Sequence, residues 1–268
     1  MKKLFILFLA VIFATSCFFA GCGDAPETDK PNSEEETITQ IDFNSLSGWK
    51  TVLLDNREAG MPDVNNHPLV IAHFESVLEF TKKSENGKSF NVFRYTSIER
   101  NFTADGTNGD EALKQVDLYK KVYTVAVGDG KYYYELYEKD FALSESLGED
   151  YPAVTHELSE ATESEKTEIE NLISPLLPNN NTLSSFKTKF SLNTFDEKGK
   201  EKASFGNVSV YETADGKYQA SADKNGVLLY GRSVSKTIYG SPAGQTYYPY
   251  SYALSLSEPV ININLKGI

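Results

Sequence analysis

The sequence predicts an α+β protein, in which a predominantly antiparallel β-sheet, curved or formed as a half-barrel meander, carries about two helices packed on one face. Three observations lead to this expectation. Aromatic residues are abundant, with 16 Tyr and 16 Phe in 268 residues, and aromatic and β-branched side chains favour strands. Alternating apolar and polar segments recur along the chain, separated by Asn-Gly and Asp-Gly turn signals. Only two segments have the periodicity of an amphipathic helix.

Residues 1–21 have the pattern of a secretory signal peptide. Lys2 and Lys3 precede an apolar run from Leu4 to Phe13, and small residues follow. This run is too short for the membrane-spanning helix of a mature protein. We therefore expect the first 21 residues to be removed on export.

The chain has two cysteines, and both lie where this leader ends. The sequence FAGC, which ends at Cys22, resembles the lipobox of bacterial lipoproteins, in which a cysteine follows two small residues and a bulky apolar one. The segment that ends at Cys17 is a poorer second candidate, and an ordinary secretory signal is the alternative. No further cysteine is present to form a disulfide, so the mature domain depends on its core alone.

The lipobox resemblance implies a lipid attachment at Cys22. Its thiol would carry a diacylglyceryl group, with fatty acyl chains such as palmitate, and Cys22 would become the mature N-terminus. Two or three chains hold firmly, because each buried CH₂ contributes about 0.8 kcal/mol. The expected location is the cell envelope, anchored to a bacterial membrane and facing outside the cytoplasm.

The charge of the chain argues against nucleic acid as a partner. The formal net charge is -12, and removal of the two leader lysines makes it about -14. Phosphate backbones repel such a surface, and no basic patch interrupts it. Anionic headgroups repel it too, so the membrane attachment is expected to come from the lipid anchor.

Three regions follow from the composition. Residues 1–21 form the leader. Residues 22–37 hold Pro, Gly, Ser and many acids without apolar periodicity, and they are expected to form a flexible acidic tether. Residues 38–268 are expected to form a single β-rich globular domain. This domain divides into two possible halves, each a helix followed by a meander, at about 67–158 and 159–268.

The first predicted helix covers residues 68–83. Val70, Ile71, Phe74, Val77 and Leu78 share one helical face, with a proline at the start and a glycine after the end. The competing interpretation is a hairpin that turns at Asn86-Gly87, since Asn-Gly is a strong turn signal.

A meander is predicted next, after one or two strands expected within residues 38–54. Its strands have the sequences FNVFRYTSIERNF, LYKKVYTVAV and KYYYELYE, and Asp129-Gly130 joins the last two as a tight turn.

The second predicted helix covers residues 159–174. Thr162 and Glu165 form a capping-box signature, and Pro175 is expected to end the helix. A second meander runs to the C-terminus. Its expected strands are SSFKTKFSLNTF, NVSVYE, KYQASA, VLLYGRSV, YSYALSLS and VININL.

A weak internal repeat links the two halves. The sequence Asp-Gly-Lys-Tyr occurs at 129–132 and again at 215–218, each time after an apolar strand. A duplication is one explanation, and the recurrence of a favoured hairpin turn is the other.

The sequence offers little catalytic chemistry. No Gly-x-Ser-x-Gly elbow is present, and His67 and His73 would lie on different faces of the predicted helix, as a helix-start residue and a surface residue, which argues against a zinc pair. Residues 105–111, DGTNGDE, lack the ligand order of an EF-hand and are expected to form a loop. We expect no catalytic residue, no metal and no cofactor.

Tyrosine-rich strands are the most suggestive feature. Exposed tyrosines can stack on sugars or line an apolar groove, although packing against a core or a second layer explains them as well. Strands such as VYTVAVGDGKYYYELYE, with the order of helices and strands, resemble the lipoprotein-carrier and lipid-carrying lipoprotein families. The resemblance implies a curved sheet around an apolar cavity, with a ligand-binding face that includes residues from both meanders. These residues are Val122, Tyr132, Tyr134, Tyr250, Tyr252 and Leu254.

Three functions therefore remain open. The first is a non-catalytic binding module for an apolar, lipid-like ligand or an envelope component such as another protein. The second is an envelope glycan hydrolase that uses two carboxylates. The third is a surface lipoprotein with a purely structural role.

Overall fold

The computed structural model describes most of the region after residue 40. The described residues are 41–59, 70–103, 114–178, 200–205, 208–213, 215–223, 227–237 and 246–268. The leader, Cys22 and the tether lie outside them, as do His67 and the loop at 105–111. Residues 38–268 form one compact unit.

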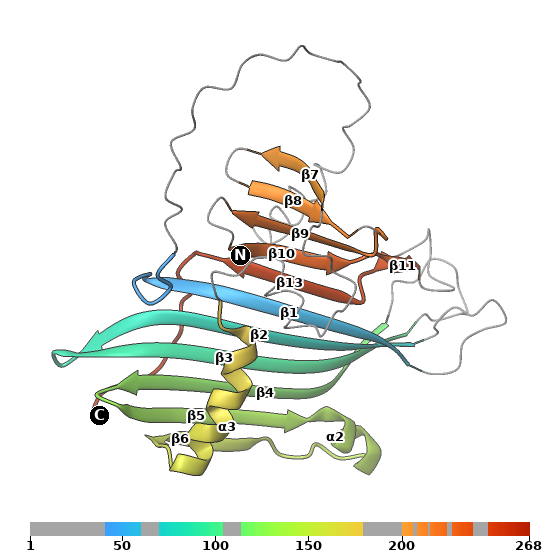
Figure 1. Ribbon diagram of the computed structural model, residues 1–268. Helices are drawn as coiled ribbons and strands as arrows, with labels where there is room; N and C mark the ends of the chain where they lie inside the picture. The colour runs from blue at the N-terminus through green and yellow to red at the C-terminus, as the bar shows by residue number, and fades with distance from the viewer. Residues whose placement is uncertain are drawn as a thin grey trace, which may run out of the picture. The chain divides into compact units, whose positions relative to one another are not determined.

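Within the described ranges, eleven strands form one open antiparallel sheet, in the order β6-β5-β4-β3-β2-β1-β13-β10-β9-β8-β7 (Figure 1). The fold class is therefore α+β with a predominantly antiparallel sheet, as predicted. The strand bounds are β1 Gly48–Ala59, β2 Val70–Glu85, β3 Lys88–Thr103, β4 Lys114–Gly128, β5 Lys131–Asp140, β6 Val154–Glu160, β7 Lys200–Phe205, β8 Val208–Glu212, β9 Tyr218–Asp223, β10 Leu228–Ser233 and β13 Tyr250–Ser255. Two short strands, β11 Lys236–Thr237 and β12 Thr246–Tyr247, pair separately.

The predicted helix at 68–83 is wrong, because this segment belongs to the long strand β2. β2 and β3 form a hairpin that turns at Asn86-Gly87, which was the competing interpretation. Both turn residues have positive φ, 52° and 79°, as a two-residue turn requires. The Asp129-Gly130 turn between β4 and β5 has the same geometry, with φ of 51° and 75°.

The second predicted helix is confirmed as α3, Glu163–Ile173, with the capping box in place. Thr162 is the N-cap, and its side chain and backbone exchange hydrogen bonds with Glu165. A 3₁₀ turn, η1 Ser174–Leu176, follows at Pro175. The start of the predicted helix was placed too early, because Ser159 and Glu160 end strand β6. Strand β6 and the short helix α2, Phe141–Leu147, were not predicted from the sequence.

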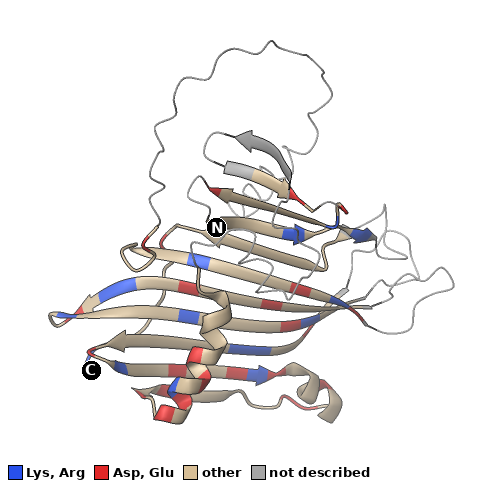
Figure 2. Ribbon diagram, in the orientation of Figure 1, with Lys and Arg blue, Asp and Glu red and all other residues tan. Residues whose placement is uncertain are grey.

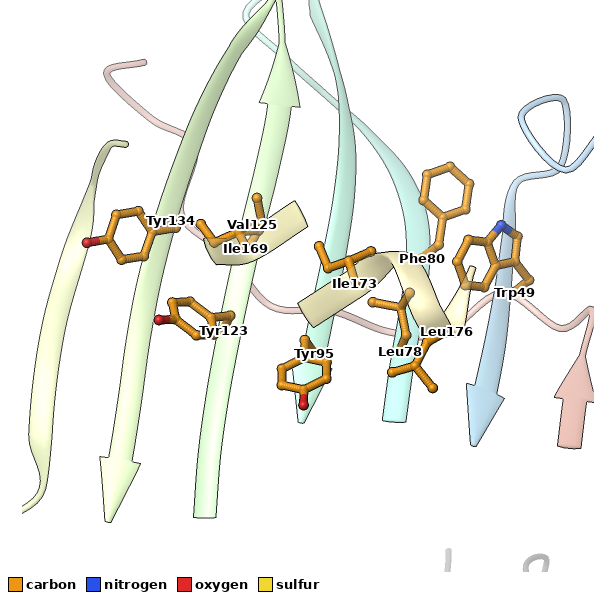
Figure 3. Packing of buried hydrophobic residues seen from close by; sticks show 10 residues of the cluster. All are labelled: Trp49, Leu78, Phe80, Tyr95, Tyr123, Val125, Tyr134, Ile169, Ile173 and Leu176. Atoms are coloured by element: carbon orange, nitrogen blue, oxygen red, sulfur yellow. The ribbon is translucent and has the colours of Figure 1, made fainter. Parts of the chain in front are cut away.

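Helix α3 lies across one face of the sheet, and its apolar side chains point to that face (Figure 3). Ile169 and Ile173 are buried there, and the Thr51 hydroxyl donates to the Leu176 carbonyl at 2.8 Å at the end of η1. This core comprises Trp49, Leu78, Phe80, Tyr95, Tyr123, Val125, Tyr134, Ile169, Ile173 and Leu176. We call this side of the sheet the helix face.

The C-terminal segment packs on the opposite face. Residues 260–265, predicted as a strand, are not a strand and cross one end of the sheet instead (Figure 1). Ile261 and Leu265 are buried against Phe90, Val92 and Ala126. The alternating apolar residues of 260–265 therefore pack into the core, and this segment does not pair with the sheet as a strand.

Much of the second meander is confirmed, at β8, β9, β10 and β13, while the strand expected at 184–195 lies outside the described residues. The repeated Asp-Gly-Lys-Tyr segments both lie in hairpins, β4–β5 and β8–β9. The two halves do not share a leading helix, because residues 70–85 are a strand. The two similar hairpins are therefore the remaining support for a duplication.

Candidate functional site

The predicted ligand-binding residues divide between the two faces of the sheet. Tyr132 and Tyr134 lie on the helix face, where both contact the core around α3. Val122 lies on the opposite face, because it differs by an odd number of residues from Tyr123 and Val125, which pack under the helix. The expectation that Val122, Tyr132 and Tyr134 share one face is therefore wrong.

Three tyrosines of β4 and β5 hold the helix to the sheet. Tyr134 donates to Glu165 at 2.6 Å, Tyr132 to Glu170 at 2.9 Å and Tyr123 to Glu168 at 2.8 Å. Burial and the hydrogen bond to Glu165 raise the pKa of Tyr134 to about 12. These tyrosines thus pack against a second layer, the helix α3. Such packing was the alternative to ligand binding that the sequence left open.

The predicted residues of β13 also lie on the helix face. Tyr252 is only 3% exposed and packs with Ala220 and Leu228, and burial raises its pKa. Leu254 is partly buried and links this cluster to the core under α3. Tyr250 is opposite Asp55 of β1 and is partly buried. Little of Tyr252 is left for contact with a ligand.

The opposite face carries a continuous row of uncharged side chains, which we call the uncharged row. The strand register brings one residue from each of ten neighbouring strands into this row. Its members, in order across the sheet, are Thr155, Tyr137, Val122, Thr96, Val77, Val52, Ala253, Tyr230, Ser221 and Val210.

Most of the uncharged row is partly exposed. Val52, Thr96 and Val122 are of intermediate burial, and Tyr137 is 38% exposed. In the described part of the chain, α3 covers the other face, and the C-terminal segment covers only the end near Ala126. The row is therefore a partly exposed, uncharged strip across ten described strands.

Ion pairs border the uncharged row on one side. Glu79, next to Val77 on the same face of β2, accepts from Arg94 Nε at 2.7 Å and lies 3.8 Å from Lys50 Nζ. Glu79 is 8% exposed, so the paired guanidinium compensates a largely desolvated carboxylate. Figure 2 shows these opposite charges on neighbouring central strands.

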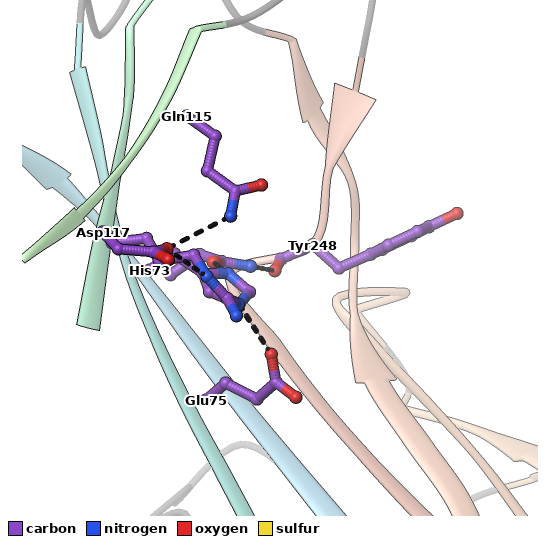
Figure 4. Close-up of polar contacts among 7 residues, drawn as sticks. His73, Glu75, Gln115, Asp117 and Tyr248 are labelled. Atoms are coloured by element: carbon purple, nitrogen blue, oxygen red, sulfur yellow. Dashed lines mark hydrogen bonds and ion pairs between the residues drawn. The ribbon is translucent and has the colours of Figure 1, made fainter. Parts of the chain in front are cut away.

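A polar cluster borders the row on its other side (Figure 4). Arg100 is its centre, with Nη1 2.8 Å from Glu75 and Nε 2.9 Å from Asp117. His73 Nε2 lies 3.7 Å from Glu75, and His73 Nδ1 bonds Asn56. Contact with His73 and then with Arg100 lowers the pKa of Glu75 to about 2, against the opposing effect of burial.

The same cluster continues along β10 and the chain before β13. Asn56 Nδ2 donates to the Tyr248 carbonyl at 2.7 Å. Arg232 donates to the Tyr248 hydroxyl at 2.8 Å and to Gln219, and its guanidinium stacks over the Tyr248 ring at 4.6 Å. These contacts fix the side chains on this border in one arrangement.

This arrangement was not predicted from the sequence, because His73 was expected on the surface of a helix. The His73 side chain is 13% exposed and packs edge-on against Phe102 at 5.3 Å. The signal that was available is the strand alternation of β2, in which His73, Glu75, Val77 and Glu79 share a face.

Among the described residues, no group of three or more His, Cys, Asp and Glu side chains is placed to hold a metal ion. None of the helices in the described ranges is long and apolar enough to cross a membrane. No family model, no curated protein and no solved structure matches this chain.

Proposed function

We propose that this chain is a lipid-anchored extracytoplasmic protein that binds an apolar, lipid-like ligand or envelope component without catalysis. The observation that carries the proposal is the uncharged row on the face opposite α3. Neighbouring strands lie about 4.8 Å apart, so a row across ten strands is about 43 Å long. Such a surface suits an elongated ligand that lies across the strands.

The borders of the row support an apolar ligand over a charged one. At the centre of the borders Glu79 and Glu75 are each paired with an arginine, Arg94 and Arg100, so these two acids do not present isolated charges to a ligand. Covering the apolar side chains would contribute about 25 cal/mol per Å² of buried apolar surface. The ion pairs on the two borders would then confine an apolar ligand to the row between them.

The glycan hydrolase is the weaker candidate on the chemistry of the described carboxyl groups. A general acid in such an enzyme needs a raised pKa. Among the described carboxyl groups, every pKa shift is a lowering, because cations and hydroxyl groups stabilise the charged forms. The groups are Glu58, Glu75, Glu165, Glu168 and Asp215.

The ligand proposal is tested with one substitution and a matched control. Val122→Lys places a charge in the uncharged row, whereas Val116→Lys places it at a partly exposed position on the other face of the same strand. We expect organic-solvent extraction of the purified protein to release lipid. Val122→Lys should lower both the amount of lipid extracted and the fluorescence of bound N-phenyl-1-naphthylamine, an apolar dye. No lipid and equal fluorescence in all three proteins would contradict the proposal.

The anchor is tested separately. Cys22→Ser removes the thiol that the lipobox resemblance marks for acylation. We expect the substituted protein to leave the membrane fraction, and mass spectrometry of the wild-type N-terminus to show a diacylated Cys22. Unchanged partitioning of Cys22→Ser would contradict the anchor and leave the ligand test unaffected.

A further inference from the structure

Strand β6 forms one edge of the large sheet. Its inner side pairs with β5, and in the described part of the chain no strand pairs with its outer side. The outer backbone amides and carbonyls of such an edge are a template on which an extended peptide can add one more strand.

Exposed apolar side chains occur in the segment that leads from α2 into β6. Val154, the first residue of β6, is 57% exposed, Tyr151 is 42% exposed, and Leu147 at the end of α2 is 53% exposed. The connection that carries them is held in place, because the Tyr151 amide donates to the Ser144 hydroxyl at 3.0 Å. We call these three residues, together with strand β6, the edge surface.

The edge surface is acidic. Residues 141–160 contain five Asp and Glu residues and no Lys or Arg. Figure 2 shows these acids along α2, its loop and β6. Lys139 pairs with Asp150 and Lys131 with Glu160, which leaves most of the acidic charge without a cation from these strands. A partner that fits this surface is cationic.

Charge disfavours the two occupants that the chain itself could supply. Antiparallel pairing of β6 with a second copy about its central residue would place Glu157 opposite Glu157 of that copy. The tether at 22–37 is also acidic, with six Asp and Glu residues and one Lys. Like charges on paired strands destabilise the pairing.

We propose that the edge surface binds an extended, cationic segment of another protein, which adds to the sheet as a strand next to β6. Alternate side chains of that segment contact Val154, Tyr151 and Leu147, and its Lys or Arg residues face the acids. The register of β6 shifts against β5 after His156, so regular pairing starts at Val154–His156, beside the apolar side chains. This proposal is independent of a ligand in the uncharged row.

The test uses the full-length protein in detergent and a fluorescein-labelled heptapeptide that alternates Lys and Val. We expect saturable binding by fluorescence anisotropy. A peptide with N-methyl groups on alternate backbone nitrogens should bind at least about tenfold more weakly, because it cannot complete the strand ladder. An alternating Glu and Val peptide should not bind.

Paired variants locate the site on the protein. Val154→Ser and Leu147→Ser should each weaken binding about fivefold or more. Val260→Ser and Leu256→Ser, at exposed apolar positions of 81% and 43% exposure outside the edge surface, should leave it unchanged. Glu157→Lys should weaken binding of the cationic peptide, and circular dichroism checks that each variant is folded.

Four outcomes would overturn the proposal. They are no binding of the cationic peptide, equal binding of its N-methylated form, equal losses in the Val260→Ser control, and a homodimer in sedimentation that Val154→Ser dissociates. The second outcome would reflect charge alone, and the last would assign the edge surface to a second copy.

Discussion

Tyr134 of β5 donates a hydrogen bond of 2.6 Å to Glu165 Oε1, while Glu165 Oε2 accepts from the Thr162 amide at 2.8 Å. One carboxylate therefore completes the capping box of α3 and fastens the helix to the sheet. The same carboxylate thus makes a contact within the helix and a contact with the sheet, and this explains why Tyr134 points to the helix.

Removal of the Tyr134 hydroxyl should weaken this attachment. We expect Tyr134→Phe to lower the free energy of unfolding by about 1 kcal/mol, the usual contribution of one hydrogen bond, measured by urea denaturation. Tyr137→Phe is the control, because Tyr137 lies on the other face and is 38% exposed. An equal loss in both variants would show that the Glu165 contact adds no stability.

The stability of the protein should fall in acid partly through Glu75. Its pKa in the folded protein is lowered to about 2 from 4.5, by His73 and Arg100. A depressed folded-state pKa favours the charged form, so its contribution is present above pH 4.5 and is lost as the pH falls towards 2.

We therefore expect Glu75→Gln to reduce stability at pH 7 and to flatten the decline in stability between pH 5 and pH 2. Urea denaturation across this range measures both effects. Glu157→Gln, on the exposed edge strand, serves as the control. A slope that Glu75→Gln leaves unchanged would count against the role of this carboxylate.

The core under α3 should be sensitive to loss of volume. Leu78 is fully buried between the sheet and the helix, and a buried Leu→Ala substitution costs about 2–5 kcal/mol through lost burial and the remaining cavity. We expect such a loss for Leu78→Ala in thermal and urea denaturation. Leu256→Ala, at a position 43% exposed, should change stability by less than about 0.5 kcal/mol.

Gly48 should not tolerate a side chain. A Cβ there would lie 2.7 Å from the Phe80 carbonyl oxygen and 2.8 Å from Cα of Glu258, so backbone on one side must move. We expect Gly48→Ala to loosen the C-terminal segment and to speed the release of its residues by carboxypeptidase. Ser47→Ala, one residue earlier and exposed, should digest as the wild type does.

Local signals were read correctly from the sequence. Asn86-Gly87 and Asp129-Gly130 fix their hairpins because both residues of such a turn need positive φ. Thr162 and Glu165 fix the start of α3 because both partners of the capping box lie within one turn. In each case the decisive contacts join residues close in the chain.

Strand β2 was misread because both of its faces meet apolar neighbours. Leu78 and Phe80 pack under α3, while Ile71 and Val77 are buried on the opposite face. Apolar residues on both faces remove the simple alternation of a strand and imitate helical spacing. The length of the apolar run alone could not decide between the two.

The sequence alone could have shown that the predicted ligand-binding residues lie on two different faces of the sheet. A two-residue turn at Asp129-Gly130 pairs Val127 with Tyr132 and Val122 with Tyr137, which already separates Val122 from Tyr132 by face. The uncharged row was not accessible, because it depends on the pairing of β1 with β13 across about two hundred residues.

The first and last strands of the described domain are neighbours, and the residues after β13 return to Gly48 and to the surface of Val92. Because β13 lies between β1 and β10, the middle of the sheet is complete only when residues 250–255 are in place. A chain truncated before residue 250 would leave two separate sheet fragments, each with an open strand edge.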